Sequence, residues 1–366
     1  MTRIAIAVLS LLLAGVAGLA APARHTAVAI SGSRFLLNGQ PTFAGRMWRG
    51  HSVEGLLPNA RLVQGIFDDL NPETRGRWAY PDTGRWDPER NTDEFVAAMP
   101  SWREHGLLAF TLNLQGGSPM GYGNQGWINS AFAADGALRP DYFARLERIL
   151  DRADDLGMVV ILGLFYFGQD QNLRDEASVL RATDDTLAWL FVRGYRNLII
   201  EACNETDVRG YDHEILRPEG IVRLLGHIRE KKSDGFAYPA GVSLGGCSLP
   251  SDGIVAASDV ILLHGNNRAG KVTTPVVIRD LVARTRALPA YRGQPIVFNE
   301  DDHYDFDQPD NDLIAATEVG ASWGYFDFRH PGEPFADGFQ SVPVDWRVSS
   351  PRKRAFFATL EEIFRR

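Results

Sequence analysis

The sequence lacks the residue patterns that mark several functional classes. Its 366 residues include 8 histidines, and these are scattered along the chain. A hydrolytic metal site needs clustered histidine and carboxylate ligands, but neither a His-x-His pair on the first predicted strand nor a His-Glu-x-x-His motif occurs. No glycine-rich loop of the P-loop form follows a predicted strand. We therefore expect an activity that uses no metal and no cofactor.

A run of basic residues is also missing. The formal net charge is −8, and the lysines and arginines are not gathered in one segment. Such a chain is a poor candidate for binding nucleic acid or an anionic membrane surface. Beyond the amino-terminal leader, no apolar run is long enough to cross a bilayer. We expect no nucleic-acid partner and no membrane association apart from that leader.

The leader has the three parts of a signal peptide. Arg3 supplies the positive charge, residues 4–19 form the apolar segment, and Ala21-Pro22-Ala23 is a small-x-small cleavage site. An uncleaved membrane anchor is the alternative, because the run is near the lower length limit for spanning. The prediction is an exported protein, secreted or periplasmic. Residues 1–23 are the signal peptide, and residues 24–366 form one catalytic domain.

Apolar runs and helical patterns alternate through the remainder of the chain. This alternation predicts an α/β fold, a (β/α)8 TIM barrel with long first and second βα loops. An amino-terminal hairpin with the turn Asn38-Gly39 is expected to cap the barrel floor. The predicted strands are residues 42–48, 107–114, 158–167, 197–203, 240–244, 259–264, 295–299 and 321–328. The predicted helices include residues 140–157, 187–192, 221–228, 276–288 and 313–319, and a last helix that begins at Ser350-Pro351.

The two long loops, residues 49–91 and 116–139, are rich in glycine and tryptophan. Loops of this length in a compact domain are usually functional. Tryptophan in an exposed loop is costly unless it covers something, and sugar faces stack well on indole. The alternative is a lid that packs on itself. Both interpretations remain open for Trp48, Trp78, Trp86 and Trp127.

Two glutamates at strand ends are the centre of the predicted site. Residues 197–203 form a buried apolar strand that leads into Asn204 and Glu205, and residues 295–299 form another that leads into Glu300. Barrel enzymes carry their catalytic groups at the carboxyl ends of strands. Glycosidic bond cleavage needs two carboxyl groups, one to protonate the leaving oxygen and one to attack or to activate water. Glu205 and Glu300 are therefore predicted to face each other across the barrel mouth.

The same strand ends resemble clan A of the retaining glycoside hydrolases, whose large branch is the cellulase-like family 5. The motifs are Glu201-x-x-Asn204-Glu205 on the fourth strand and Ile296-Val297-Phe298-Asn299-Glu300 on the seventh. The resemblance implies that Glu205 is the acid/base, that Glu300 is the nucleophile, and that Asn204 holds the 2-hydroxyl of the bound sugar. It covers the whole barrel, including the amino-terminal hairpin.

Several positions depart from the family 5 pattern, so we expect a divergent member of the clan. Thr206 follows the Asn-Glu pair in place of proline, and the strand-six motif is His264-Gly265-Asn266 instead of His-x-Tyr. The tyrosine that would touch the nucleophile is thus missing. The strand-eight tryptophan aligns with either Trp323 or Phe326. The remaining departures are Thr111 and Asn113 where the family has an arginine, and Gly163 and Phe165 where it has Asp and His.

The strand-end positions also supply candidate sugar-binding residues. For His264 the alternative is a hydrogen-bonded histidine at the barrel rim, and Glu201 is interpreted as structural because it lies low in the barrel. The predicted substrate-binding residues are Asn204, His264, Asn113, Trp48, Trp323, Arg46 and Tyr166.

The sequence therefore predicts a retaining glycoside hydrolase that acts on a poly- or oligosaccharide by double displacement. The alternative is a carbohydrate-binding barrel that has lost catalysis. Retention of both glutamates argues against that alternative. Cys203 and Cys247 end neighbouring predicted strands, and they could form a disulfide or remain two separate thiols.

Overall fold

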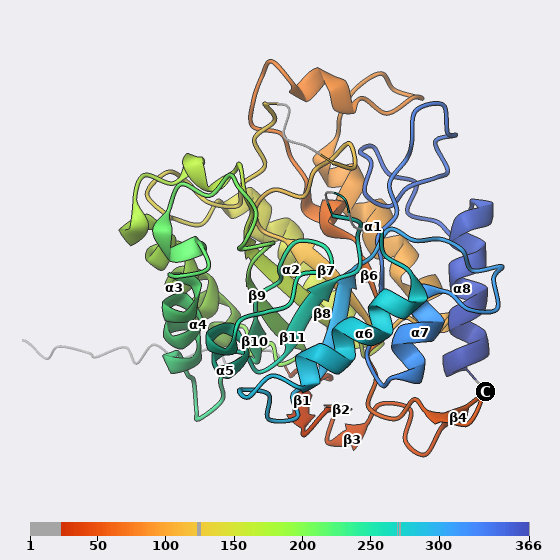
Figure 1. The fold of residues 1–366 in the computed structure, drawn as a ribbon. Coiled ribbons are helices and arrows are strands. Elements are labelled where there is room, and N and C mark those ends of the chain that lie inside the picture. Colours follow the sequence, from red (N-terminus) through yellow and green to blue (C-terminus); the bar gives the residue numbers. More distant parts are fainter. Residues whose placement is uncertain (1–22, 123–125, 269, 271, 366) are drawn as a thin grey trace, which may run out of the picture.

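A computed structural model describes residues 23–122, 126–268, 270 and 272–365. Within these residues, eight parallel strands form a closed ring with helices around it (Figure 1). The strands are β6 (Asn59–Arg61), β7 (Ala109–Asn113), β8 (Val159–Phe165), β9 (Leu198–Cys203), β10 (Ala240–Gly241), β11 (Ile261–His264), β12 (Ile296–Glu300) and β13 (Gly324–Tyr325). The predicted (β/α)8 barrel is confirmed.

The ring closes through three kinds of contact. β10, β9, β8, β7, β6 and β13 pair in that order, and β11 pairs with β12. Between β10 and β11, the Asp259 amide donates to Ala240 O at 2.7 Å. Between β12 and β13, parallel bridges join Val297 to Ser322 and Asp301 to Tyr325. Because no edge of the sheet stays open, the carboxyl ends of all eight strands meet at one mouth.

The helices begin and end at residues suited to those positions. Asp87, Thr274 and Ser350 cap three helices through their side chains, and each precedes a proline in the first turn. The second helix ends at Gly157, whose φ of 67° is left-handed. The helices are α1 (Pro88–Glu104), α2 (Pro140–Leu156), α3 (Glu176–Val192), α4 (Ile221–Glu230), α5 (Asp252–Ala257), α6 (Pro275–Arg286), α7 (Asp312–Glu318) and α8 (Pro351–Phe364).

The amino-terminal hairpin closes the floor of the barrel, as predicted. Strands β1 (Val28–Ser31), β2 (Arg34–Leu37) and β3 (Gln40–Pro41) form an antiparallel sheet beneath the ring (Figure 1). Asn38 and Gly39 both have positive φ, which the tight turn between β2 and β3 requires. Val28 and Phe35 join an apolar cluster with residues from the lower ends of the barrel strands.

The prediction for the first barrel strand was wrong. Residues 47–48 form β4 (Met47–Trp48), which pairs antiparallel with β5 (His51–Ser52) below the barrel, and the first barrel strand is β6. β6 has only three residues, two of them polar, and it lies within the stretch that looked like one long loop. A strand this short contains no apolar run by which it could be recognised. Residues 42–48, in contrast, have a pattern that resembles a strand.

Several other elements also differ from the prediction. Neither α1 nor α5 was predicted, and α3 begins at Glu176 rather than near Leu187. Strand eight is shorter than predicted and is limited to Gly324–Tyr325. Residues 1–22, which hold most of the predicted signal peptide, lie outside the described residues. In the part of the chain that is described, no helix has the length and apolar character needed to span a membrane.

The two cysteines are not joined in a disulfide. The buried Cys203 thiol donates to Leu216 O at 3.6 Å. Cys247 Sγ lies 2.8 Å from Thr273 Oγ1. Burial raises the pKa of the Cys203 thiol, which makes it unreactive. The second alternative for this pair, two separate thiols, is therefore the one observed.

Candidate active site

Glu205 lies two residues beyond the end of β9 and is held there by its backbone. Its φ of 50° is left-handed, which is uncommon for a residue with a side chain. Its amide donates to Ser243 Oγ at 3.0 Å, and the neighbouring Asn204 amide donates to Phe165 O at 3.0 Å. Backbone strain of this kind persists only where the surroundings enforce it, and it gathers at functional sites.

A β-bulge at the end of β12 directs two successive side chains into the barrel. Leu263 pairs with Phe298 but His264 pairs with Glu300, so Asn299 is the extra residue. Asn299 Nδ2 donates to Glu201 Oε1 at 3.2 Å, inside the barrel. The Glu300 side chain lies one layer nearer the mouth than Asn299, among the groups at the strand ends. Bulges commonly re-aim side chains next to active sites.

The two glutamates lie close together at the barrel mouth. Carboxylate oxygens of Glu205 and Glu300 and a ring nitrogen of His264 all lie within 4.8 Å of one another. Their surroundings are nearly closed, because the side chains of Glu205 and Glu300 are 15% and 7% exposed. The two strand ends, far apart in the sequence, therefore supply one site.

Arg61, at the end of β6, is a site residue that the sequence interpretation missed. Its Nε lies 2.6 Å from Glu300 Oε2, and its Nη2 donates to Asn204 Oδ1 at 2.9 Å. The side chain is 1% exposed. Burial alone would lower the pKa of Arg61, but the nearby acidic groups, Glu300 first among them, together outweigh burial and raise it. A guanidinium can bind two oxygen partners at once in fixed geometry.

Arg61 escaped the sequence interpretation because the first strand was misplaced. The family pattern suggested an arginine on strand two, and this chain has Thr111 and Asn113 there. The structure supplies the guanidinium from strand one instead. The signal that could have found it is the Asn59-Ala60-Arg61 run directly after Pro58, where the chain leaves the floor.

His264, the last residue of β11, and Asn266, two residues later, complete the surroundings of the glutamates. Asn266 Nδ2 donates to Glu300 Oε1 at 2.5 Å, so it contacts the carboxylate that a family tyrosine would touch. His264 Nδ1 lies 3.0 Å from Glu205 Oε1 and 3.7 Å from Glu300 Oε2. Burial alone would lower the pKa of His264, but the charge of Glu300 and the hydrogen bond with Glu205 raise it.

The group Glu205, His264 and Glu300 has the donor atoms to hold a metal ion. The neighbours argue against that use. Arg61 and Asn266 each donate to one oxygen of Glu300, so both oxygens already have partners. A divalent cation would also have to sit beside the buried guanidinium. These contacts favour carboxylate chemistry at this site.

The remaining candidates near the site lie around and below it. Tyr166 Oη is 2.7 Å from Ser118 Oγ, and burial together with the nearby Glu300 raises the pKa of this phenol. Asn113 is level with Gly163 and Glu201 in the strand register, beneath the glutamates. A Cβ on Gly163 would come within 2.2 Å of Asn113 Oδ1. Glycine at position 163 therefore makes room for the polar layer that contains Glu201.

Arg46, Trp48 and Trp323 are not at the site. Arg46 and Trp48 belong to the segment below the barrel, where Arg46 Nε donates to Ile363 O at 2.7 Å and Trp48 Nε1 to Glu362 at 3.2 Å. Their misplacement follows from the wrong first strand. The Trp323 indole donates to Asp301 Oδ2 at 2.7 Å, and its ring contacts Phe356 of α8. It therefore packs between the barrel and its outer helix.

The loop tryptophans pack on the protein itself. Trp78 and Trp127 are each 1% exposed, and the Trp78 indole donates to Asp69 Oδ2 at 2.6 Å. Trp86 stacks on Tyr80 with ring centroids 5.6 Å apart. Of the two interpretations of these loops, a self-packed lid is the one that the described contacts fit.

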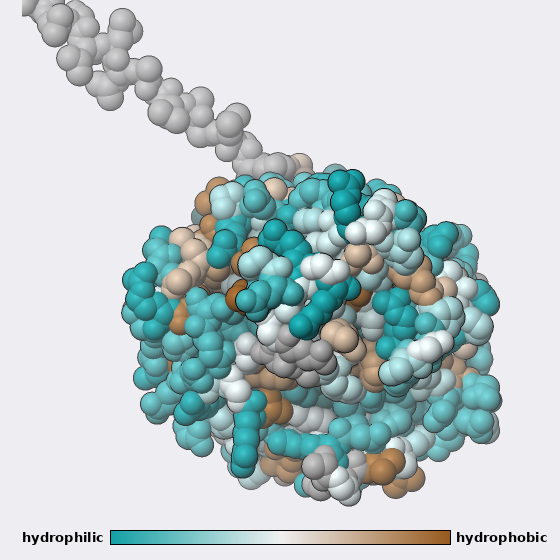
Figure 2. All heavy atoms as spheres, turned by 90° about the horizontal axis from the view of Figure 1, so that it is seen from above, coloured by the Kyte–Doolittle hydropathy of each residue, from teal (hydrophilic) through white to brown (hydrophobic). Residues whose placement is uncertain are grey.

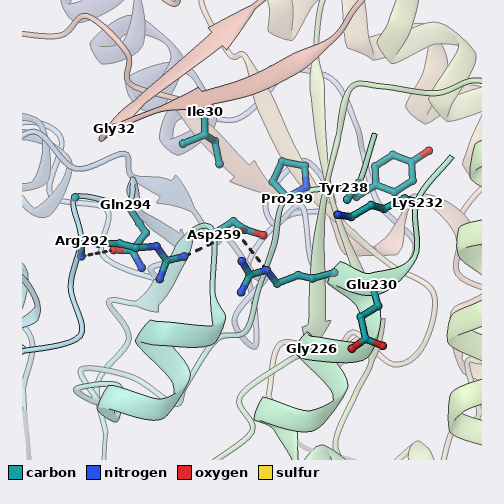
Figure 3. Close-up of a pocket in the computed structure, with 13 residues that line it drawn as sticks. Ile30, Gly32, Gly226, Glu230, Lys232, Tyr238, Pro239, Asp259, Arg292 and Gln294 are labelled. Carbon is teal, nitrogen blue, oxygen red and sulfur yellow. Dashed lines mark hydrogen bonds and ion pairs between the residues drawn. The ribbon is translucent and has the colours of Figure 1, made fainter. Parts of the chain in front are cut away.

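A cavity of about 900 Å³ lies at the opposite end of the barrel (Figure 3). It is bordered by the hairpin and by residues that precede β10, β11 and β12. Asp259 lies between Arg229 at 3.6 Å and Arg292 at 3.9 Å. Arg292 also donates to Ser258 O at 2.7 Å. In barrels, groups at this end serve stability, so the cavity does not compete with the mouth as the active site.

Solved structures share this fold. No protein-family model and no curated protein sequence matches the chain. A family 5 glycoside hydrolase from Prevotella bryantii matches with a TM-score of 0.54 at 11% identity, over 84% of this chain and 94% of that one. A family 5 mannosidase from Rhizomucor miehei matches with a TM-score of 0.53 at 11% identity, over 93% and 97%.

A proposed glycoside hydrolase from Bacteroides vulgatus also matches, with a TM-score of 0.53 at 13% identity. The match covers 88% of this chain but only 59% of that longer protein. At such low identity these likenesses establish the barrel fold. The resemblance to family 5 seen in the two strand-end motifs is thus confirmed for the fold as a whole.

Proposed function

We propose that the protein is a retaining glycoside hydrolase of poly- or oligosaccharides, with residues 24–366 as its catalytic domain. The observation that carries this proposal is the pair Glu205 and Glu300 at the mouth of the barrel, where a carboxylate oxygen of each lies within 4.8 Å of the other. Retaining enzymes hold their two carboxyl groups about 5–5.5 Å apart, whereas inverting enzymes need about 6.5–9.5 Å to admit water.

In the first step, Glu300 attacks the anomeric carbon and the bond to the leaving sugar breaks. Glu205 donates its proton to the leaving oxygen. Arg61 and Asn266 hold the Glu300 carboxylate by donating to its two oxygens, which aims the nucleophile before substrate binds. Glu300 becomes a glycosyl ester and loses its negative charge.

In the second step, Glu205 acts as the base. It takes a proton from water, the water oxygen attacks the anomeric carbon, and Glu300 leaves as a carboxylate. Asn204 accepts a hydrogen bond from Arg61 at its Oδ1, which leaves its Nδ2 group to donate to the sugar 2-hydroxyl. Two inversions at one carbon give a product of retained configuration.

The test compares Glu300→Gln with Glu205→Gln. Glu300→Gln should reduce turnover by several orders of magnitude on every substrate, because covalent catalysis has no substitute. Glu205→Gln should spare the first step for aryl glycosides with an acidic phenol, which need little protonation, and lose it for natural sugar leaving groups. Azide should restore breakdown of the glycosyl-enzyme in Glu205→Gln and give a glycosyl azide of retained configuration.

Glu54→Gln is the matched control, since Glu54 pairs with Arg34 near the barrel floor and should leave turnover unchanged. Equal losses in both site variants, without dependence on the leaving group and without azide rescue, would refute the assigned roles. A wild-type protein that binds a glycan without cleaving any would favour the alternative, a carbohydrate-binding barrel.

We also propose that the protein is exported, to the periplasm or the medium. The support is the leader pattern of residues 1–23, with Arg3 before an apolar segment and Ala21-Pro22-Ala23 after it. Expression of the full chain in a bacterial host, with amino-terminal sequencing of the product, tests the proposal. A mature protein that begins at Arg24 is expected, and an uncleaved chain in the membrane fraction would support an anchor instead.

A further inference from the structure

The loop after β7 lies at the barrel mouth and is bonded to several neighbouring loops. We call residues 116–122 the strap. Gly117 O accepts hydrogen bonds from Gln64, at 2.5 Å, and from Gln340. Pro119 O accepts from the Val342 amide at 2.9 Å. These partners belong to the loops after β6 and β13, so the strap is fixed to both.

Two side chains of the strap extend the attachment. Ser118 Oγ lies 2.7 Å from Tyr166 Oη, directly after β8. Tyr122 Oη donates to Asp302 Oδ2 at 2.7 Å, two residues beyond Glu300. The Tyr122 ring meets Phe326 and Phe328 edge-on, with centroids 5.6 and 5.1 Å away. The strap is therefore connected to the loops after β6, β8, β12 and β13.

Two glycines of the strap permit these close approaches. Gly116 has a φ of 75°, and a Cβ there would come within 2.1 Å of the Tyr166 ring. Gly121 has a φ of 100°, and a Cβ there would come within 2.6 Å of Phe328. A side chain at either position would push the strap away from the mouth. The sequence thus keeps this segment close to its neighbours.

Among the described residues, the strap is bonded to only one side of the ring of strands, as defined by the two glutamates. β9 and β12, which carry Glu205 and Glu300, divide the ring of strands into two arcs. One arc holds β10 and β11, and the other holds β13, β6, β7 and β8. A glycan bound between the glutamates can leave the mouth over either arc. The attachments of the strap all lie along the second arc or at its edge.

From these contacts we infer that the protein is exo-acting and removes short units from the non-reducing ends of glycan chains. This inference rests on the proposed function. Asn204, which would hold the sugar attacked by Glu300, is bonded to Arg61 of the covered arc. In this proposal that sugar lies on the side of the mouth that the strap occupies, and the rest of the glycan leaves over β10 and β11. An internal segment of a polymer, which needs both exits, does not fit.

The surface around the mouth agrees with a carbohydrate ligand. Figure 2 looks onto this face, and hydrophilic residues predominate there. Tyr122 is 50% exposed, so the strap offers part of an aromatic ring to solvent. Aromatic rings with one polar end are suited to amphipathic ligands such as sugars.

The experiment measures where bonds are cut. Wild-type protein is given carboxymethylcellulose and glucomannan, with viscosity and new reducing ends followed together, and oligosaccharides of both types labelled at the reducing end. Exo action predicts little loss of viscosity per bond broken, with labelled products that shorten stepwise while unlabelled short sugars accumulate. A rapid loss of viscosity with labelled fragments of mixed length would overturn the inference and leave the proposed function standing.

Variants of the strap test its role directly. Tyr122→Ala, alone and together with Gln340→Ala, removes attachments of the strap to the loops after β12 and β13. The share of internal cuts should rise severalfold, while hydrolysis of aryl β-glucosides and β-mannosides is retained. Tyr291→Ala is the matched control and should not change the products, because Tyr291 precedes β12 at the barrel floor, where its hydroxyl donates to Gln294 O. An unchanged cleavage pattern in both strap variants would refute the role of the strap. Absence of hydrolysis on these substrates and on a panel of other plant, algal and bacterial polysaccharides would overturn the proposed function, and this inference with it.

Discussion

Arg61 Nε lies 2.6 Å from Glu300 Oε2, and the same guanidinium donates to Asn204 Oδ1 at 2.9 Å. One buried cation thus connects the first, fourth and seventh barrel strands at the point where the proposed chemistry takes place. The arrangement gives the buried Glu300 carboxylate a counter-charge and fixes the Asn204 amide. Both consequences can be measured.

Replacing Arg61 by methionine should damage activity and stability together. Loss of one preorganised donor at the reacting group is expected to lower turnover by about 10²–10³-fold. Because Glu300 would remain buried without a partner, the free energy of unfolding should fall by about 3–5 kcal/mol. Steady-state kinetics and urea denaturation measure the two effects. Arg34→Met removes a half-exposed ion pair with Glu54 and is the control, with an expected change of about 0–1 kcal/mol.

Asn266→Ala removes the donor from the other oxygen of Glu300. A hydrogen bond to a charged group contributes about 1.5–3 kcal/mol, so kcat/KM should fall by about 10–150-fold. The fold should survive, because the new side chain is smaller and position 266 lies in the loop after β11, outside the apolar core. Circular dichroism checks the fold and steady-state kinetics the activity. Wild-type activity in this variant would show that Asn266 does not position the nucleophile.

The Asp312–His303 pair beside the site should make stability fall as pH rises. Burial, with the nearby charge of Asp301, raises the pKa of Asp312 to about 8. Burial alone would lower the pKa of His303, but the hydrogen bond and charge of Asp301 raise it to about 9. Both pKa values exceed those of the unfolded chain, about 3.9 for Asp and 6.5 for His. The native state therefore binds more protons than the unfolded chain. Its free energy of unfolding should decrease as pH rises from about 4 to about 9.

Asp312→Asn tests this pH dependence. The variant no longer needs the extra proton, so its free energy of unfolding should vary less than that of the wild type between about pH 4 and 8. Urea denaturation at three pH values measures the difference, which should favour the variant progressively as pH rises. Asp310→Asn changes an exposed carboxylate that pairs with Arg279 and should run parallel to the wild type. Parallel curves for Asp312→Asn as well would contradict the prediction.

The sequence by itself determined the features that depend on local patterns. Seven of the eight barrel strands were located because buried parallel strands appear as apolar runs. The Asn38-Gly39 turn specified the hairpin, and the proline and glycine signals set the ends of α2. The strand-end positions of Glu205 and Glu300 followed from the same runs. Each of these features is encoded within a few neighbouring residues, so it can be read without knowledge of the fold.

Only the tertiary structure decided which distant residues surround the glutamates. Arg61 lies on a strand of three residues, too short for any apolar pattern, and its role depends on the closure of the ring. The bulge at Asn299 is defined by how β12 pairs with β11, which the sequence of β12 does not show. The position of the strap likewise depends on its partners in four other loops. Trp323 and Phe326 could not be told apart until α8 was seen to pack against Trp323. Contacts of this kind arise from packing between elements far apart in the chain, which local propensity does not encode.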